Sequence, residues 1–472
     1  MTTETIMYIA DTILEFINVF FVLYLIGYST FLFLSVTVGS SELFKKKRQY
    51  RMMNAIKNDY YIPISIIVPA YNEEVTVTST VSSLLSLDYK VYEVIVVDDG
   101  STDDTSKVMI DAFNMAPVRM PIHRQLSCQQ EEFVYESKIH NVQVTLVRKK
   151  NGGKADALNM GINASRYPYF ICIDADSVLQ YDSLKKIALP LLENENVVAV
   201  GGSVRPSNGA KIEGGHVVSY KLPKNILASM QTLEYDRSFL ASRILLDKFN
   251  GALIISGAFG LFQKRVVIEA GGYDPSTMGE DMELVVKLHE YCTANEIPYL
   301  IKYATDAICW SQAPENLRDL MKQRRRWHIG LFQSLWMHRH LAANPKYGPV
   351  SFISYTYFLL YELLSPYIEV FGILSVLMAF ALDMLNIRFA LLFTAIYAAF
   401  GSIMSLTSFF ARTQTLDLKL SFTDVMKAIG LCLFEVTLLR SILSFTRFFA
   451  LFRYRKKKRS WGKIQRKKID IR

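Results

Sequence analysis

Residues 64–74 read ISIIVPAYNEE, an apolar β-branched run that ends abruptly in a polar loop. The same change follows residues 91–97 (VYEVIVV), which run into DDGSTDDT, and residues 169–173 (YFICI), which run into DADS. Helical patterns at 74–85, 103–113 and 154–164, and an apolar run at 143–147, complete the series. This alternation predicts right-handed βαβ units, and therefore a parallel sheet that binds ligands at the carboxyl ends of its strands.

Acidic side chains gather at those strand ends. Asp98 and Asp99 follow one predicted strand, and Asp174 and Asp176 follow another. Each motif is weak alone, because Asp-Gly-Ser is a common turn. On one edge of a sheet, however, like charges repel unless a cation or a hydrogen-bonded ligand compensates them. Oxygen ligands without Cys or His favour Mg²⁺ or Mn²⁺ completed by substrate phosphate, which predicts a nucleotide diphosphate ligand.

The stretch KKNGGKADALN, residues 149–159, suits the same anion. Lys149, Lys150 and Lys154 supply positive charge, and the glycines let backbone NH groups approach a phosphate at a helix start. The stretch is not a Walker A loop, and no GxGxxG motif opens the predicted sheet. These absences argue against a kinase and a dehydrogenase.

Two later helices carry unusual charge. In GGYDPSTMGEDMELVVKLHEY, residues 271–291, Glu280 and Asp281 stand together at the start of a helix. Acids there complement a helix dipole, but they are also candidates for a catalytic base. LRDLMKQRRRWHIGLFQSLWMH, residues 317–338, reads as an amphipathic helix with a basic face, which is typical of a membrane surface.

The composition points to a membrane protein, since 51% of the 472 residues are hydrophobic and 12% are aromatic. Apolar blocks at 13–38, 352–382 and 389–410 exceed the roughly 20 residues that a helix needs to cross a bilayer. A fourth block at 425–452 is interrupted by Glu435, Arg440 and Arg447. We expect that block to lie partly in the interface or to pack against the other spans, because charges in lipid are costly.

Basic residues predict the orientation. Lys45, Lys46, Lys47 and Arg48 follow the first span, and residues 453–468 contain ten Lys and Arg. By the positive-inside rule both segments are cytoplasmic, in the plasma membrane of a cell. The tail accounts for the net charge of +9, so it is a topology and lipid-headgroup signal and not evidence for nucleic acid. The expected domains are a transmembrane helix (1–44), a catalytic domain (45–340), transmembrane or interfacial helices (341–452) and a basic tail (453–472).

The five cysteines are scattered, and neither they nor the histidines show a spacing typical of zinc. We therefore expect free thiols in a reducing compartment and no zinc site.

Seven motifs occur in an order that resembles the membrane-embedded, processive family 2 glycosyltransferases. They are PAYNEE, VDDGS, NGGKADALN, DAD, SGAFG (256–260), GED (279–281) and QRRRW (323–327). The resemblance covers residues 62–340 and the flanking spans. It implies an α/β GT-A glycosyltransferase domain inserted between transmembrane helices. Where the family has Thr-Glu-Asp, this chain has Gly279, which leaves both carboxylates in place.

The resemblance also implies roles for individual residues. Asp281 is expected to be the catalytic base, and Glu280 to orient it or to bind the acceptor. The donor nucleotide is expected to contact Tyr71, Glu73, Asp99, Lys154, Asp174, Gln323 and Arg326. Asp176, with Asp174, is the expected ligand of Mg²⁺ or Mn²⁺. Trp327 and the stretch Ser256, Gly257, Ala258 and Phe259 are expected to border the acceptor sugar.

The expected activity is processive, inverting transfer from a UDP-sugar to a growing β-linked polysaccharide, coupled to its passage across the membrane. A β-glucan, cellulose-like or mixed-linkage, is the first expectation for the product. The alternatives are a poly-N-acetylglucosamine or hyaluronan synthase, a non-processive transferase acting on a lipid, and an inactive membrane scaffold. The sequence assigns no sugar, linkage or oligomeric state, and no role to residues 104–142 or to the tail motif SWGKIQRKK (460–468).

Overall fold

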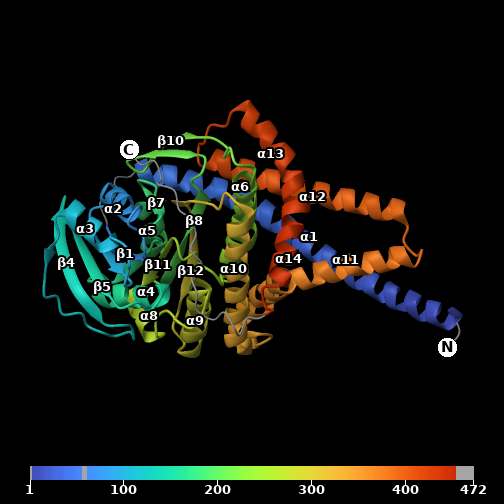
Figure 1. Ribbon diagram of the computed structural model, residues 1–472, viewed down its shortest axis with the longest axis horizontal. Helices are drawn as coiled ribbons and strands as arrows, with labels where there is room; N and C mark the ends of the chain where they lie inside the picture. Colours follow the sequence, from blue (N-terminus) through green and yellow to red (C-terminus); the bar gives the residue numbers. More distant parts are fainter. Residues whose placement is uncertain (1–2, 56–60, 453–472) are drawn as a thin grey trace.

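The computed structural model describes residues 3–55 and 61–452. Figure 1 shows a sheet covered by helices at one end of the molecule, with three long helices extending away from it. These are α1 (Thr3–Ala55), α11 (Ser365–Ala381) and α12 (Ile387–Thr415). The tail motif at 460–468 lies outside the described residues.

A ten-stranded sheet forms the centre of the domain between the first and the later apolar helices, in the order β3-β4-β5-β2-β1-β6-β11-β8-β12-β7. Its strands are β1 (Ile64–Ala70), β2 (Tyr92–Asp98), β3 (Ala116–Pro117), β4 (Glu131–Ile139), β5 (Val142–Lys149), β6 (Tyr169–Cys172), β7 (Ser177–Leu179), β8 (Val197–Pro206), β11 (Gly260–Gln263) and β12 (Leu300–Ser311). A separate hairpin contains β9 (Ala210–Glu213) and β10 (His216–Tyr220).

Helices cover both faces of this sheet, because its buried strands present apolar side chains in both directions. Val81, Met109 and Leu184 pack on one face, from α2 (Val77–Leu85), α3 (Thr105–Phe113) and α5 (Ser183–Glu193). Three helices cover the other face: α4 (Lys154–Ala164), α8 (Lys264–Glu269) and α9 (Glu280–Ala294). The remaining helices of the domain are α6 (Ile226–Phe239), η1 (Leu240–Ile244), α7 (Leu245–Asp247) and α10 (Leu317–Met337).

The predicted alternation of strands and helices is confirmed where it was strongest. Strands β5, β2, β1 and β6 pair in parallel, so the loops after β1, β2 and β6 share one edge of the sheet. The sheet also contains strands that this pattern did not predict, since β11 pairs antiparallel to both β6 and β8. β4 likewise runs antiparallel to β5, as a hairpin at the other end of the sheet.

Residues 104–142 therefore contain α3, the short strand β3, an irregular stretch and the strand β4 of that hairpin. The stretch that precedes β4 is held across α4 by side chains of that helix: Asn163 accepts from the backbone NH groups of Gln125 and Leu126, and Asp156 accepts from Gln129. Leu126 is buried in the core beneath it. The segment is therefore a structural cover for α4.

Among the described residues, three helices are long and apolar enough to cross a membrane: Thr12–Gln49, Ile387–Thr415 and Phe422–Phe448. The predicted span at 352–382 consists of two helical segments, Val350–Leu363 and Ser365–Ala381, which together are long and apolar enough to cross a membrane but are bent by 47° at the break. The first contains η4 (Val350–Tyr355) and η5 (Phe358–Leu363), and η2 (Arg339–Leu341) and η3 (Pro345–Tyr347) lead into it.

The fourth block, expected to be a weaker candidate, passes as a candidate span by length and composition. It contains α13 (Phe422–Phe434), η6 (Glu435–Leu439) and α14 (Arg440–Phe448). Two of its charges are paired, Glu435 with Arg237 and Arg440 with Glu369, which lowers their cost in lipid, whereas the buried Nε of Arg447 has no partner among the described residues. In Figure 1, α14 nevertheless runs alongside α10 and crosses the direction of α11 and α12.

Candidate active site

The loops after β1, β2 and β6 meet at one edge of the sheet, as the sequence predicted, but their side chains are used differently. Asp98 is fully buried and accepts hydrogen bonds from the backbone NH of Ser101 and the hydroxyl of Ser106, so it holds its own turn. Asp174 and Asp176 remain partly exposed at the end of β6. Asp174 lines the cavity described below, whereas Asp176 is partly exposed but is not part of that lining.

Asp99 organises the Gly-rich loop before α4. Its carboxylate pairs with Lys149, and it accepts the backbone NH groups of Gly152 at 3.0 Å and of Gly153 at 2.7 Å. Tyr71 is 46% exposed, and Glu73 is buried and accepts from the hydroxyl of Thr76. These three residues belong to the loops after β1 and β2 and do not line the cavity described below.

Lys154, the first residue of α4, joins the acids of two loops. Its ammonium lies 2.6 Å from Asp174 and 3.5 Å from Glu280, and its side chain is only 12% exposed. Burial alone would lower the pKa of Lys154, but the charges of Asp174 and Glu280 outweigh it and hold the pKa above its usual value. A fixed positive charge therefore stands between the two acidic pairs.

The Glu280 and Asp281 carboxylates at the start of α9 face different partners. Asp281 accepts the backbone NH of Gly257 at 3.1 Å and that of Met282 at 2.9 Å. A Cβ on Gly257 would stand 3.2 Å from the Lys154 ammonium, so a glycine there lets the SGAFG loop approach both charged groups. Burial raises the pKa of Glu280, Lys154 opposes this, and the neighbouring Asp281 charge adds to it.

Glycine replaces the family's threonine at position 279 for a visible reason. Cβ atoms built on Gly279 and Gly330 would lie 2.8 and 2.7 Å from the opposite Cα, so the start of α9 and the middle of α10 meet backbone to backbone. Gln333, one turn further along α10, accepts the NH of Met278 at 2.8 Å. The loop that carries the acids is thus fixed to α10.

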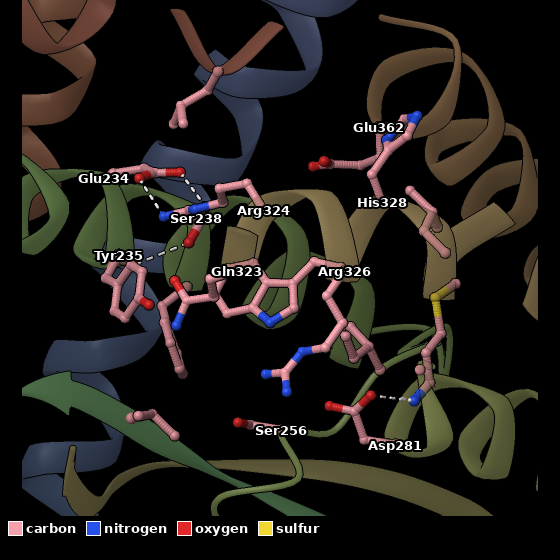
Figure 2. Close-up of a pocket in the computed structure, with 18 of the residues that line it drawn as sticks. Glu234, Tyr235, Ser238, Ser256, Asp281, Gln323, Arg324, Arg326, His328 and Glu362 are labelled. Carbon is pink, nitrogen blue, oxygen red and sulfur yellow. Dashed lines mark hydrogen bonds and ion pairs between the residues drawn. The ribbon is translucent and has the colours of Figure 1, made fainter. Parts of the chain in front are cut away.

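Two of the three arginines of the QRRRW motif, Arg324 and Arg326, point in different directions from α10. Arg324 forms a bidentate pair with Glu234, 2.7 Å at each contact, and its guanidinium lies 4.6 Å from the ring of Trp327. Figure 2 shows Arg326 directed instead toward Asp281 and Ser256. Arg324 therefore fixes the ring of Trp327, and Arg326 faces the reacting groups.

A cavity of about 420 Å³ connects these groups with the membrane helices. Its predicted members are Lys154, Asp174, Ser256, Gly257, Ala258, Glu280, Asp281, Gln323, Arg326 and Trp327. It continues past His328 to Tyr28 of α1, to Tyr361 and Glu362 of η5, and to Arg440 of α14. Phe259 lies outside it: its ring is fully buried in the core, where it fills the space above Gly202, so we no longer assign it to the acceptor.

Gln323 and His328 line this cavity, and each has buried polar atoms without a partner among the described residues. These atoms are the side-chain oxygen of Gln323 and both ring nitrogens of His328, whose side chain is 2% exposed. Desolvation, with a smaller contribution from Arg447, lowers the pKa of His328 to about 3, so its ring is neutral. Unpaired buried polar groups are costly, and in a cavity they indicate a ligand. Sequence reasoning missed His328, although it directly follows Trp327.

The chemistry of the Asp174 and Asp176 pair fits a divalent cation. Both offer only carboxylate oxygens, both are partly exposed, and they follow the strand β6 at the edge where a nucleotide would bind. Lys154 already neutralises part of this charge through Asp174.

A family model described as glycosyltransferase like family 2 matches residues 62–330. The chain belongs to this family. It is therefore a glycosyltransferase, with the GT-A fold that the resemblance implied. Poly-beta-1,6-N-acetyl-D-glucosamine synthase of Staphylococcus epidermidis is 30% identical over 321 residues, which are 66% of this chain and 67% of that protein. The synthase of the same name from Staphylococcus aureus strain COL is 30% identical over 311 residues, 65% of this chain and 64% of its own.

Among solved structures, a mannosyltransferase from Pyrobaculum calidifontis in complex with GDP-Man and Mn²⁺ shares the fold. Its TM-score is 0.52 at 18% identity, and the match covers 82% of this chain and 98% of that one. None of the relatives described above is a glucan synthase, so the first expectation of a β-glucan product is not supported. The alternative, an N-acetylglucosamine polymer, agrees better with the relatives.

Proposed function

We propose that this glycosyltransferase is a processive synthase that transfers N-acetylglucosamine from UDP-N-acetylglucosamine to a growing β-1,6-linked polymer. The observation that carries this proposal is the cavity, which begins at Asp281 and continues among the membrane helices, as a long acceptor requires. The identity of the sugar and its linkage rests on the relatives.

Asp281 is the proposed base. Its two oxygens are oriented by the NH groups of Gly257 and Met282, which leaves acceptor capacity on the cavity side. It takes the proton of the acceptor hydroxyl as that oxygen bonds to C1 of the donor sugar. The bond from C1 to the diphosphate breaks at the same time, with inversion, and UDP leaves with the electron pair.

We propose that Lys154, Arg326 and Gln323 stabilise the negative charge that develops on the leaving diphosphate. Asp174 and Asp176 would hold the Mg²⁺ or Mn²⁺ ion, which supplies further charge neutralisation when bound. Tyr71, Glu73 and Asp99 are proposed to hold the nucleoside, in the case of Asp99 through the Gly152–Gly153 loop that it fixes.

On the acceptor side, Trp327 offers its ring to a sugar face, and Ser256, Gly257 and Ala258 border the same space. We propose that His328 and Glu362 contact the next sugars of the chain through their hydroxyl or amide groups. The polymer would then pass between α1, η5 and α14. We further propose that the catalytic domain is cytoplasmic, that the domains have the limits predicted from the sequence, and that 422–448 lies in the interface beside α10.

The test is UDP release by the purified protein in detergent, with a panel of UDP-sugars and with Mg²⁺, Mn²⁺ or EDTA, followed by sizing of the product. We expect release with UDP-N-acetylglucosamine, its loss in EDTA, and a long product that a β-1,6-specific hexosaminidase degrades. Release with UDP-glucose alone would contradict the assigned sugar.

The same assay separates the other readings. One sugar added to a lipid, without a long product, would identify a non-processive transferase. No release with any donor, in the presence of lipid extracts and chito-oligosaccharides as acceptors, would favour an inactive scaffold and would overturn the proposal.

A further inference from the structure

Three potential metal ligands meet far from the cavity, where the end of α9 lies beside the end of α10. Glu290 is on α9, His338 ends α10, and His340 lies in η2 just after it. One oxygen of Glu290 is 2.6 Å from Nδ1 of His338, and the other is 3.0 Å from Nε2 of His340. One ligand atom from each residue lies within 4.8 Å of the other two.

The donor set differs from that of the Asp174 and Asp176 pair. Two imidazole nitrogens and one carboxylate oxygen are typical of Zn²⁺ and related transition metals, whereas Mg²⁺ and Mn²⁺ prefer oxygen alone. His340 and Glu290 are 47% and 34% exposed, so an ion can enter and a water molecule can complete its shell. His338 is only 8% exposed and would anchor the ion from the protein side.

A buried carboxylate stands behind the buried histidine. The second ring nitrogen of His338 lies 3.4 Å from Glu283, whose side chain is 1% exposed and also contacts Lys287 at 3.1 Å. Ligating histidines in metal sites commonly donate their other NH to a carboxylate, which fixes the ring and its tautomer. His338 is placed in this way, with Glu290 at one ring nitrogen and Glu283 at the other.

We propose that Glu290, His338 and His340 bind one transition-metal ion, with Zn²⁺ as the expected occupant, and that this ion ties the end of α9 to the end of α10. The first residues of α9 are Glu280 and Asp281, and α10 carries Arg326 and Trp327. An ion at the far ends of both helices thus holds the reacting groups in a common frame. The inference does not depend on the identity of the sugar.

The fold brings these ligands together, since Glu290 and His338 are 48 positions apart in the chain. The expectation from the sequence that no zinc site exists relied on local spacing, which cannot detect such a pair. Hydrogen bonds alone would produce the same distances without an ion, so the test has to measure the metal.

The experiment uses the full-length chain in detergent, purified through a tag without histidine, in an Asp176→Asn background that weakens the other cation site. After treatment with EDTA, ZnCl₂ is added, excess metal is removed, and bound zinc is counted by mass spectrometry. Binding of Co²⁺ is followed by its visible absorption. Two variants test the ligands, His340→Ala and Glu290→Gln, and His123→Ala serves as a control at an exposed histidine elsewhere.

We expect about one zinc per chain in the background protein and in the control, with at least tenfold weaker binding in both ligand variants. Zinc should also raise the Tm of the first two proteins and not of the ligand variants, because an ion that binds only the folded state stabilises it. Absence of stoichiometric zinc, or equal binding by His340→Ala, would overturn the proposal. Neither readout requires sugar transfer, so a failure of the proposed function would not affect it.

Discussion

Asp281 is the residue whose loss should separate chemistry from binding. In Asp281→Asn the oxygens that accept from Gly257 and Met282 are retained in part, but the proton acceptor is gone. We expect UDP release to fall by about 10²- to 10⁴-fold, which is the usual contribution of a general base, with little change in affinity for UDP. Steady-state kinetics and calorimetric titration of UDP measure the two effects. Asp274→Asn, in the same loop, is the control, and equal activity of both variants would exclude Asp281 as the base.

Replacing Glu280 by a neutral residue should raise the stability of the protein and lower its activity. Its pKa is raised in the folded protein, by burial first and by Asp281, against the opposing charges of Lys154 and Arg326. A carboxyl group whose pKa is raised on folding favours the folded state at low pH, and this contribution is lost as the pH rises through the raised pKa. Glu280→Gln should therefore have a higher Tm than the wild type at pH 8, a smaller difference at pH 5, and lower activity. A lower Tm at pH 8 would contradict this.

His328 offers a comparable test at the acceptor side. His328→Phe removes a buried polar group that has no partner within residues 3–55 and 61–452, so the Tm should rise slightly. If the ring contacts the polymer, the same change removes one hydrogen bond, worth about 1 kcal/mol, and should shorten the product and lower kcat/KM by about 3- to 10-fold. Gel sizing and UDP release measure both. A stabilised variant with unchanged product length would assign His328 a structural role only.

For single residues, the type and order of the amino acids predicted which side chains lie together, but not which partner each side chain contacts. Lys154, Glu280, Asp281 and Arg326 converge as expected. The difference between Arg324 and Arg326 depends on which face of α10 meets Glu234, and the isolation of His328 depends on helices distant in the chain. Neither is visible in a local pattern.

Among the elements, the crossing of α9 and α10 is the most sensitive to a single methyl group. Gly330→Ala places a Cβ about 2.7 Å from the Cα of Gly279, between two backbones that cannot rotate away. Such overpacking typically costs 1–3 kcal/mol, and here it also moves the loop that carries Asp281. We expect a lower Tm and a loss of UDP release. Gly430→Ala is the control, because a Cβ there meets nothing within 4 Å. Full activity of Gly330→Ala would show that the close approach is not required.

Helices and strands with a clear periodic pattern of apolar residues were predicted well. Strands whose place depends on antiparallel pairing with a distant partner were not. The helix expected at 154–164 has these bounds in the structure, because a glycine precedes it and its apolar face is continuous. The antiparallel strand β11 and the hairpin of β4 and β5 were missed, since pairing partners are chosen by the whole sheet. The bend between η5 and α11 was missed as well, although Pro366 marks it.

In the whole molecule, ion pairs join the catalytic domain to the membrane helices. Composition and hydropathy predicted the catalytic domain and the membrane helices, but not the interface between them. That interface uses a charged residue that interrupts an apolar block of the sequence, Glu435. Arg237 of α6 forms a bidentate pair with Glu435 of η6, at 2.6 and 2.8 Å, and both side chains are largely buried. Lys47 and Asp417 form a second, exposed pair between α1 and the end of α12.

Replacing one member of the buried pair should therefore destabilise the contact between the catalytic domain and the membrane helices. Replacing both members by apolar residues should not. Glu435→Gln leaves the Arg237 charge buried without its partner, which typically costs 3–5 kcal/mol, whereas an exposed pair such as Lys47 with Asp417 contributes about 0–1 kcal/mol. We expect a clearly shorter half-life of activity on heating in Glu435→Gln, near wild-type behaviour in Asp417→Asn, and recovery in the double variant Arg237→Met, Glu435→Leu. Half-life is the appropriate measure, because unfolding in detergent is commonly irreversible. If the double variant were as unstable as the sum of its single changes, the pair would not couple the two parts, and their attachment would have to come from apolar packing alone.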